Sequence, residues 1–322
     1  MNQIAEARLE VKQRAPSALA IWAAMLSVYI AWGSTYLAIR FAVETMPPFL
    51  MAGLRFVIAG AVLFLVRRMQ GDVAPSDREW RSAAVIGLLL LLGGNGGVVW
   101  AEQRVSSGHA ALMVGAAPLW MVLIDSLRAG GRRPSWLAIV GVLVGFAGIV
   151  VLIGPGASSA DKIDPIGAGV LVLATVAWAA GSLYSRKAAL PVSPLLGTSM
   201  EMMMGGLGLL TLGTVTGEWG RLNLSAVSNE SWLGWGYLIV FGSWVGFGSY
   251  TWLLRVAPTP LVSTYAYVNP IVAVLMGNWL ASEPLTPRTL IAAGVIVGSV
   301  VLTTIANQRV KRQPTIPESE TA

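Results

Sequence analysis

Residues 134–152 read PSWLAIVGVLVGFAGIVVL, and residues 287–305 read PRTLIAAGVIVGSVVLTTI. Each stretch begins with a proline, and apart from Arg288 neither contains a charged residue. As helices, both are long enough to cross the roughly 30 Å hydrocarbon core of a membrane at about 1.5 Å per residue. Aligned on their first residues, the two stretches share glycines at Gly141/Gly294 and Gly145/Gly298. They therefore predict a membrane protein that contains a repeated unit.

Ten apolar runs of about 18–22 residues occur along the 322-residue chain, so we expect an all-α polytopic membrane protein with ten transmembrane helices. Strands are a poor alternative, because the runs lack the alternation of a barrel strand and are about twice as long. Lipid also offers no partner to exposed backbone groups, which favours helices. The expected runs are residues 18–39, 49–66, 82–101, 107–124, 135–153, 166–185, 195–216, 232–253, 260–280 and 289–306.

The composition supports this fold class and excludes several functions. Apolar residues make up 55% of the chain and charged residues only 12%, about half the charge of a soluble domain. With no cysteine and one histidine, the sequence excludes a disulfide-stapled domain and a Cys/His metal centre, and we expect no metal site. It has no phosphate-binding loop, clustered carboxylates or activated nucleophile, so we expect no cofactor, no catalytic residue and no enzymatic activity.

The basic residues predict how the chain is oriented in the membrane. Of the 22 lysines and arginines, 16 lie in the two tails and in the loops that follow even-numbered runs, and 5 lie in the other loops; Arg55 falls within a run. Because basic residues accumulate on the cytoplasmic side, both termini are expected in the cytoplasm. The net charge of +6 is therefore mainly a topology signal, and no nucleic-acid partner is expected.

Further matches between the two halves indicate that the repeat covers most of the chain. GSTY at residues 33–36 matches GSLY at residues 181–184, and Trp100 in the third run matches Trp252 in the eighth. Five runs per repeat is an odd number, so the second repeat would enter the membrane from the opposite side. Inverted repeats around a midplane site are typical of alternating-access carriers. We expect a cytoplasmic tail at 1–17, five-helix repeats at 18–153 and 166–306, and a second cytoplasmic tail at 307–322.

The stretch AWGSTYLAIRFAVETMPPFLMAGLRFVIAGAVLFL at residues 31–65, followed by a proline-containing fourth run, resembles the EamA-type drug/metabolite transporter superfamily. Within that superfamily, the chain is most similar to YddG-type amino-acid exporters of the bacterial inner membrane, which implies the same location for this chain. The resemblance implies an efflux carrier whose central cavity is lined mainly by spans 1, 3, 4, 6, 8 and 9. It also implies that spans 5 and 10 lie at the periphery, and that spans 2 and 7 lie away from the deepest part of the cavity.

Arg55 and Glu201 are the only charged side chains well inside the expected runs, and they occupy corresponding places in the two halves. Charges within a membrane are costly and usually face the interior of the bundle. One interpretation is that these two contact a zwitterionic substrate or move protons. The other is structural: they pair with each other or with helix ends and brace the second and seventh spans.

Polar and aromatic residues within the runs are candidates for binding substrate. Asn95 lies within GGNGG, where glycines weaken the helix and could free backbone groups for a ligand; close helix packing through small residues is the alternative. Tyr265, Tyr267 and Asn269 come shortly before Pro270 and combine apolar rings with polar tips, which would suit an amino acid. The further substrate candidates are Trp100, Met113, Tyr184, Tyr250 and Trp252.

Three further residues are candidates for roles in the transport cycle, two as hinges or gates and one as a proton site. Pro118 and Pro270 fall at matching places in the fourth and ninth runs, where each removes a backbone hydrogen bond. We interpret them as hinges or gates, with simple packing as the alternative. His109 is the one side chain whose ordinary pKa lies near neutral pH, so it is a candidate proton site; a satisfied residue at a span end is the alternative.

The sequence thus predicts a secondary transporter that exports small metabolites, with amino acids as the leading substrate class. Drugs or other small metabolites are the alternative substrates, and a channel or a lipid scramblase is the alternative function. The expected partners are the small-molecule substrate and membrane lipids. A monomer is favoured, with a homodimer as the alternative.

Overall fold

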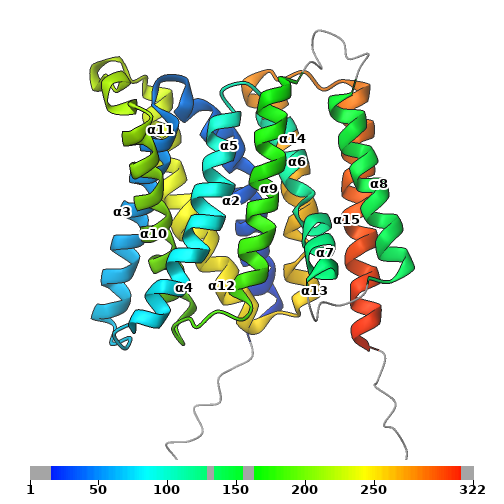
Figure 1. The fold of residues 1–322 in the computed structure, drawn as a ribbon, viewed down its shortest axis with the longest axis horizontal. Helices are drawn as coiled ribbons and strands as arrows, with labels where there is room; N and C mark the ends of the chain where they lie inside the picture. The colour runs from blue at the N-terminus through cyan, green and yellow to red at the C-terminus, as the bar shows by residue number, and fades with distance from the viewer. Residues whose placement is uncertain (1–15, 129–133, 155–162, 313–322) are drawn as a thin grey trace, which may run out of the picture.

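The computed structural model describes residues 16–128, 134–154 and 163–312, and within these ranges every regular element is a helix. The helices run side by side between the two ends of the molecule (Figure 1). In chain order they are α2 (Ala18–Thr45), α3 (Pro48–Met69), α4 (Asp77–Gly87), the π-helix η1 (Leu88–Asn95), α5 (Gly96–Ala101), α6 (Ser107–Gly115), α7 (Ala117–Leu127), α8 (Trp136–Ile153), α9 (Pro165–Ser185), α10 (Pro194–Val215), the 3₁₀ turns η2 (Glu218–Arg221) and η3 (Leu224–Ala226), α11 (Asn229–Tyr237), the π-helix η4 (Leu238–Val245), α12 (Gly246–Val256), α13 (Thr259–Val262), α14 (Tyr265–Ala281) and α15 (Pro287–Arg312).

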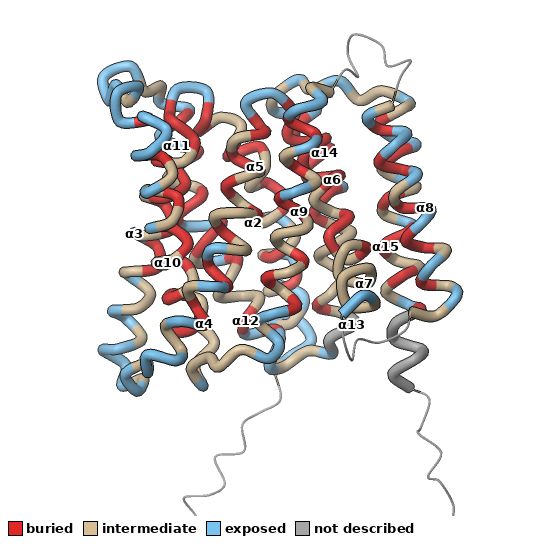
Figure 2. Tube along the Cα trace, in the orientation of Figure 1, coloured by how far each residue is buried: buried red, intermediate tan, exposed pale blue. Residues whose placement is uncertain are grey.

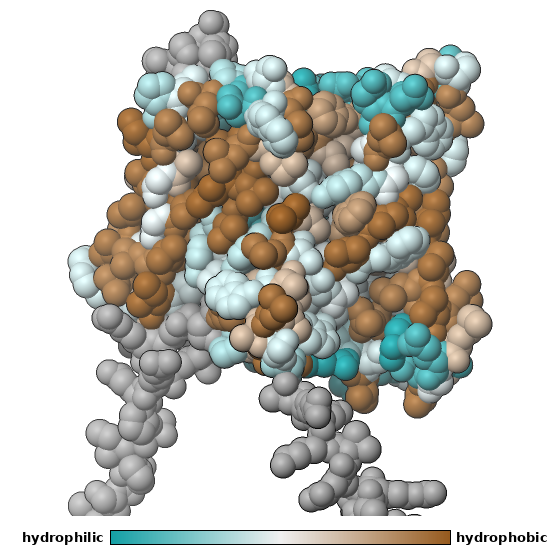
Figure 3. All heavy atoms as spheres, turned by 180° about the vertical axis from the view of Figure 1, so that it is seen from behind, coloured by the Kyte–Doolittle hydropathy of each residue, from teal (hydrophilic) through white to brown (hydrophobic). Residues whose placement is uncertain are grey.

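Nine helical segments of the described chain are long and apolar enough to cross a membrane. They correspond to the first eight and the tenth of the expected runs, with α4, η1 and α5 forming one segment, α6 and α7 another, and α11, η4 and α12 a third. The ninth expected run forms the four-residue α13 and the 17-residue α14. Seen from behind, the surface shows a broad apolar region between polar rims at the two ends, which suits a bundle that lies in a bilayer (Figure 3).

Short local signals set where the helices begin. Before α4, the Ser76 hydroxyl accepts the Glu79 N–H and the Glu79 carboxylate accepts the Ser76 N–H, which together form a capping box. Asp164 caps α9 by accepting the Gly167 N–H at 2.6 Å. Proline occupies the first position of α3, α9 and α10, where its missing N–H has no intrahelical partner to lose. These signals place the helix starts within a few residues of the predicted runs.

The third and eighth spans each contain a π-helical stretch at a corresponding place. η1 covers Leu88–Asn95 and η4 covers Leu238–Val245, each between two α-helical halves of its span. The glycines of η1 also allow close packing, since a Cβ added to Gly94 would lie 2.9 Å from the Trp178 ring of α9. The helix is therefore irregular at the GGNGG stretch, and its glycines admit a neighbouring helix; binding of a ligand by freed backbone groups stays a prediction.

Two pairs of helices, α3 with α10 and α8 with α15, form the outer edges of the bundle (Figure 1). In the second pair, Gly141 and Gly145 of α8 face Ser299 of α15, so small residues let the two helices approach closely. The matched glycines of α15, Gly294 and Gly298, have no heavy atom within 4 Å of an added Cβ and do not take part. The other helices lie between these pairs, and buried residues run through them (Figure 2).

The chain enters and leaves the bundle at the same end, because α2 begins and α15 ends there (Figure 1). We call this the tail end. The α5–α6 and α14–α15 connections lie at the opposite end, which we call the distal end. Because the first helix begins and the last helix finishes at the tail end, the chain crosses between the tail end and the distal end an even number of times.

Candidate substrate-binding site

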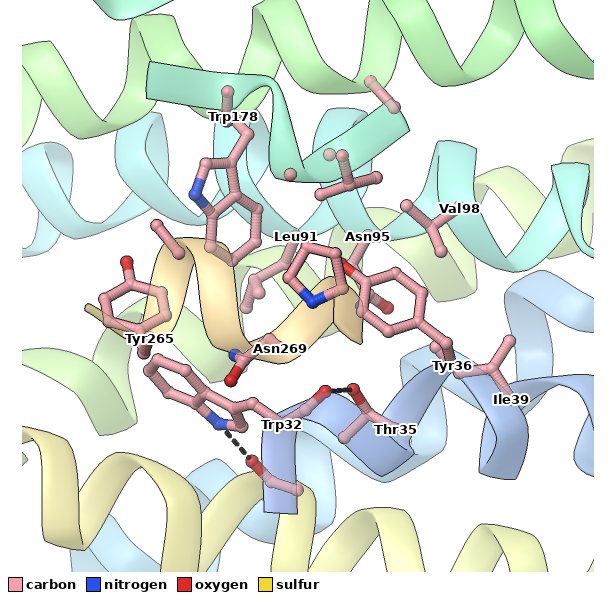
Figure 4. A pocket seen from close by; sticks show the side chains of 18 of the residues that line it. Trp32, Thr35, Tyr36, Ile39, Leu91, Asn95, Val98, Trp178, Tyr265 and Asn269 are labelled. Carbon is pink, nitrogen blue, oxygen red and sulfur yellow. Dashed lines mark hydrogen bonds between the residues drawn. The ribbon is translucent and has the colours of Figure 1, made fainter. Parts of the chain in front are cut away.

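A cavity of about 150 Å³ lies among the central helices. Its walls come from α2, α3, η1, α5, α6, α7, α9, η4, α12 and α14, and no residue of α8, α10 or α15 lines it. These are mainly the spans that the resemblance implies, but α3 departs from that expectation because its Arg55 and Phe56 line the cavity. The aromatic rings of Trp32, Tyr36 and Trp178 supply much of the remaining wall (Figure 4).

Arg55 is a buried cation at this cavity, with only 3% of its surface exposed. Its Nε donates to the Ser243 hydroxyl at 3.2 Å, and its guanidinium lies 4.5 Å from the centre of the Phe56 ring. Ser243 in turn donates to the main-chain oxygen of Leu238, five residues earlier in the π-helix η4. The Nη1 of Arg55 has no hydrogen-bond partner among the described residues. A buried guanidinium with a free N–H group is suited to binding an anionic group.

Two asparagines bring further unpaired polar groups to the cavity. Asn95 is the last residue of η1, Asn269 precedes Pro270 in α14, and both line the cavity (Figure 4). The carboxamide oxygen of each is buried, and neither has a hydrogen-bond partner within the described ranges. Buried polar groups are normally paired. These two acceptors and the free Arg55 nitrogen therefore form a set that a polar ligand would complete.

A cluster of aromatic side chains forms one wall. The indole N–H of Trp32 donates to the main-chain oxygen of Gly242 at 3.1 Å (Figure 4). The centre of the same ring lies 5.0 Å from that of Phe247, 5.1 Å from that of Tyr250 and 5.3 Å from that of Tyr265. Edge-on and tilted contacts of this kind are favourable, so the cavity presents a well-packed aromatic surface.

The structure brings six of the predicted site residues to the cavity wall, namely Arg55, Asn95, Pro118, Tyr265, Asn269 and Pro270. Tyr250 packs behind this wall, against Trp32 and Tyr265. Trp100 lies away from it, with the Arg104 guanidinium 4.1 Å from the centre of its ring. Tyr184 and Trp252 are 42% and 37% exposed and do not line the cavity. Their predicted contact with substrate has no geometric support in this conformation.

Arg55 and Glu201 are not joined in the structure. Within the part of the chain that the structure describes, no ion pair links the two side chains, and Glu201 does not line the cavity. The main-chain oxygen of Glu201 faces Gly87, where α4 and α10 pack closely. The two intramembrane charges therefore do not brace each other, and only Arg55 faces the candidate site.

The two predicted hinge prolines have different local geometries. The fourth span breaks at Ala116, between α6 and α7 and two residues before Pro118. Pro270 lies inside α14, and the ninth span breaks earlier, between α13 and α14. A Cβ added to Gly115 would lie 2.6 Å from the Pro270 ring, so the two proline-containing spans are in close contact. Movement at either proline stays a prediction.

His109 is buried near the distal end and does not line the cavity. Its Nδ1 lies 2.9 Å from the Ser106 hydroxyl, and its Nε2 lies 3.2 Å from the Thr289 hydroxyl. Both ring nitrogens thus have hydrogen-bond partners, which is the satisfied arrangement; a role in proton transfer stays a prediction. Met113 and Tyr267 pack in or against the main core and also lie outside the cavity wall.

The residues that sequence reasoning missed supply most of the aromatic surface: Trp32, Tyr36, Phe56 and Trp178. The sequence held a signal for two of them, since Tyr36 belongs to the GSTY repeat match and Trp32 directly precedes it. Phe56 and Trp178 had no signal, because a membrane helix is apolar on the face that meets lipid as well as on the face that meets protein.

Comparisons with known proteins agree with this architecture. The sequence model of the EamA-like transporter family matches the chain twice, at residues 18–154 and 165–305. The inner membrane transporter YedA of Escherichia coli K12 is 39% identical over 300 residues, which cover 92% of this chain and 95% of YedA. A transporter of Archaeoglobus fulgidus is 25% identical over 281 residues, which cover 86% and 95% of the two chains.

A solved crystal structure shows the same fold, with a TM-score of 0.59 and 21% sequence identity over 92% of this chain and all of the other. The family match covers both halves of the chain, and YedA matches nearly its whole length. Like these relatives the chain is a membrane transporter, and it belongs to the EamA-like transporter family.

Proposed function

We propose that this protein is a secondary transporter of the YddG type, which exports amino acids across the bacterial inner membrane. The observation that carries the proposal is the set of unpaired polar groups in one cavity: the Arg55 guanidinium and the carboxamide oxygens of Asn95 and Asn269. An amino acid offers the complementary groups, since its carboxylate can accept from Arg55 and its ammonium can donate to the amide oxygens.

The size and lining of the cavity favour a small metabolite over a drug. Its volume of about 150 Å³ is well below the roughly 300–1,000 Å³ of pockets for drug-sized ligands. The walls around the polar groups are apolar or aromatic, with Trp32, Tyr36 and Trp178 among them. Such walls would accept the side chain of an amino acid while Arg55 and the asparagines hold its charged ends.

The proposed architecture is ten spans in two inverted five-helix repeats. The ninth span would consist of α13 and α14 together, which lie between the eighth and tenth spans in the chain. Three observations support the inverted repeat: the family matches twice, π-helices occur at corresponding places in spans 3 and 8, and α2 begins at the end where α15 finishes. Inverted repeats of this kind accompany alternating access. One chain supplies every wall of the cavity, so we propose that a monomer transports.

Transport in proteoliposomes tests the substrate class. Proteoliposomes that contain the purified protein would be loaded with one unlabelled amino acid at a time. Counterflow would then be followed as the uptake of radiolabelled amino acid from outside. We expect saturable uptake that internal amino acid stimulates and that Arg55→Gln shifts to higher substrate concentration. Uptake of lipophilic cations but of no amino acid would contradict the proposal, and unsaturable flux would indicate a channel.

A further inference from the structure

Glu102 is the most deeply buried charged residue of the described chain, yet its carboxylate has no partner. It directly follows α5 and has 0% of its surface exposed. Neither carboxylate oxygen has a hydrogen-bond partner among the described residues. Burying an ionised carboxylate without partners is costly enough that such a group tends to bind a proton instead. The residue lies one position beyond the expected third run, so it is not among the charged residues within the runs.

The charged groups around Glu102 leave its carboxylate without a hydrogen-bonded counter-ion. Arg40 of α2 comes close, but its Nη1 donates to the main-chain oxygen of Glu102 at 3.0 Å. Glu283, from the α14–α15 connection, faces Glu102 with a like charge, and Tyr36 of α2 also faces it. Nearby groups on the other elements are engaged elsewhere: Arg104 with the Trp100 ring, Asp164 with the Gly167 N–H, and His109 with Ser106 and Thr289.

Glu283 itself is well provided with donors. Its carboxylate accepts the Ser107 N–H at 2.8 Å, the Ser107 hydroxyl at 2.9 Å and the Gly108 N–H at 3.0 Å. These three bonds hold the Glu283 carboxylate in place, and its like charge opposes a second charge on Glu102. Burial and then Glu283 raise the pKa of Glu102 well above that of an exposed carboxyl, and Arg40 only partly opposes them.

Glu102 lies between the cavity and the distal end. It is one helical turn beyond Val98, which lines the cavity, and it begins the α5–α6 connection at the distal end. Val105 of that connection is 2% exposed and belongs to the main core, together with Ile39 of α2 and Leu171 of α9. An opening of the distal end has to separate these groups and would bring water to the carboxyl.

We propose that Glu102 is a proton-binding residue of this carrier, protonated while the distal end is closed and ionised when that end opens. On opening, the O–H bond of the carboxylic acid breaks, the proton passes to water at the distal end, and the carboxylate remains hydrated. Closing requires a proton to return. The proposal rests on the proposed function only in that the two ends of the cavity open alternately.

The direction of the pH dependence follows from proton linkage. Below the pKa of an exposed glutamate, about 4.3, both states hold the proton and pH does not affect the equilibrium. Above it, the closed state holds a proton that the open state has released. Rising pH therefore favours opening of the distal end, until the closed state also loses its proton.

Accessibility of an introduced cysteine tests this without knowledge of the transported solute. Val105→Cys places a thiol in the packed barrier of this cysteine-free chain, and Val73→Cys, at a position 85% exposed, serves as a reference. Each protein is reconstituted in nanodiscs and labelled with a charged methanethiosulfonate reagent between pH 5.5 and 8.5. The ratio of the two rates corrects for the ordinary ionisation of a thiol, and the same ratio measured in Glu102→Gln controls for the different surroundings of the thiol at position 105. We expect this ratio to rise roughly fivefold or more over that range.

Variants assign the response to Glu102. In Glu102→Gln the rate ratio should no longer depend on pH, while Glu44→Gln, an exposed carboxylate on α2, should leave the rise unchanged. Glu283→Gln should move its midpoint to lower pH, because a like charge has been removed. That shift also tests the proposal if Glu102→Gln fails to fold.

A flat profile in the parent protein, a rise that persists in Glu102→Gln, or an unmoved midpoint in Glu283→Gln would overturn the proposal. The labelling ratio and amino-acid counterflow can fail independently. If the labelling ratio does not depend on pH but the protein transports amino acids, only the proposal for Glu102 is wrong. If the labelling ratio depends on pH but no amino acid is transported, only the proposed substrate is wrong.

Discussion

At the scale of single residues, Arg55 is expected to determine which solutes bind. Its Nη1 is free, and its Nε is held by Ser243, so the guanidinium is both available and oriented. A hydrogen bond to a charged group contributes about 1.5–3 kcal/mol. We therefore expect Arg55→Gln to weaken binding of a carboxylate-containing solute by roughly 10- to 100-fold. The concentration dependence of counterflow measures this change.

The control for this substitution is Arg78→Gln, which removes an exposed arginine at the start of α4. It should leave the half-saturating concentration unchanged, because an exposed charge far from the cavity contributes little. Arg55→Lys keeps the charge but loses the forked geometry and should fall between the two. Equal half-saturating concentrations in Arg55→Gln and the parent protein would remove Arg55 from the site.

At the scale of elements, small residues hold the cavity-forming helices at short distances. A Cβ added to Gly33 of α2 would lie 2.6 Å from the Cβ of Val272 and 3.3 Å from the main-chain oxygen of Asn269, both in α14. We expect Gly33→Ala to push α2 away from α14 and to lower stability by about 1–3 kcal/mol. The melting temperature of the detergent-solubilised protein should fall accordingly.

Gly169→Ala is the matched variant, since nothing lies within 4 Å of an added Cβ at this position in α9. Alanine is the better helix former by about 1 kcal/mol, so the melting temperature should stay the same or rise. If Gly33→Ala proved as stable as Gly169→Ala, the contact between α2 and α14 would be looser than the structure shows.

At the scale of the whole molecule, the number of crossings decides where the two termini lie. Ten spans put both termini on one side, and the distribution of basic residues predicts the cytoplasm. Green fluorescent protein fused to either terminus should therefore fluoresce, and alkaline phosphatase fused there should be inactive. The phosphatase should be active when fused after Gln103, in the α5–α6 connection at the distal end. An active phosphatase at one terminus would contradict the ten-span arrangement.

Much of the fold could be predicted from the sequence because membrane insertion is a local property. A run of about 20 apolar residues must form a helix in lipid, whatever the rest of the chain does. Capping residues and prolines then set the starts, as Ser76 and Asp164 do here. The repeat was visible for the same reason, since helix starts and glycines recur at similar spacing in the two halves.

The candidate site was predicted only in part, because contacts between spans are not encoded by a local pattern. Arg55, Asn95 and Asn269 stood out singly as polar residues in apolar runs, but their meeting at one cavity follows from how three spans pack. π-helices shift the faces of the third and eighth spans, so residue spacing alone does not tell which side chains face inward.

The sequence by itself thus determined that this is a helical membrane protein with a repeated half, since apolar runs and charge placement depend on each segment alone. The tertiary structure decided which polar groups share the cavity. It also decided that Glu102, a residue outside the expected runs, is a fully buried carboxylate without a hydrogen-bond partner among the described residues. The physical reason is that burial depends on what packs around a side chain, and the groups near Glu102 include Arg40 of α2 and Glu283 of the α14–α15 connection, both far from it in sequence.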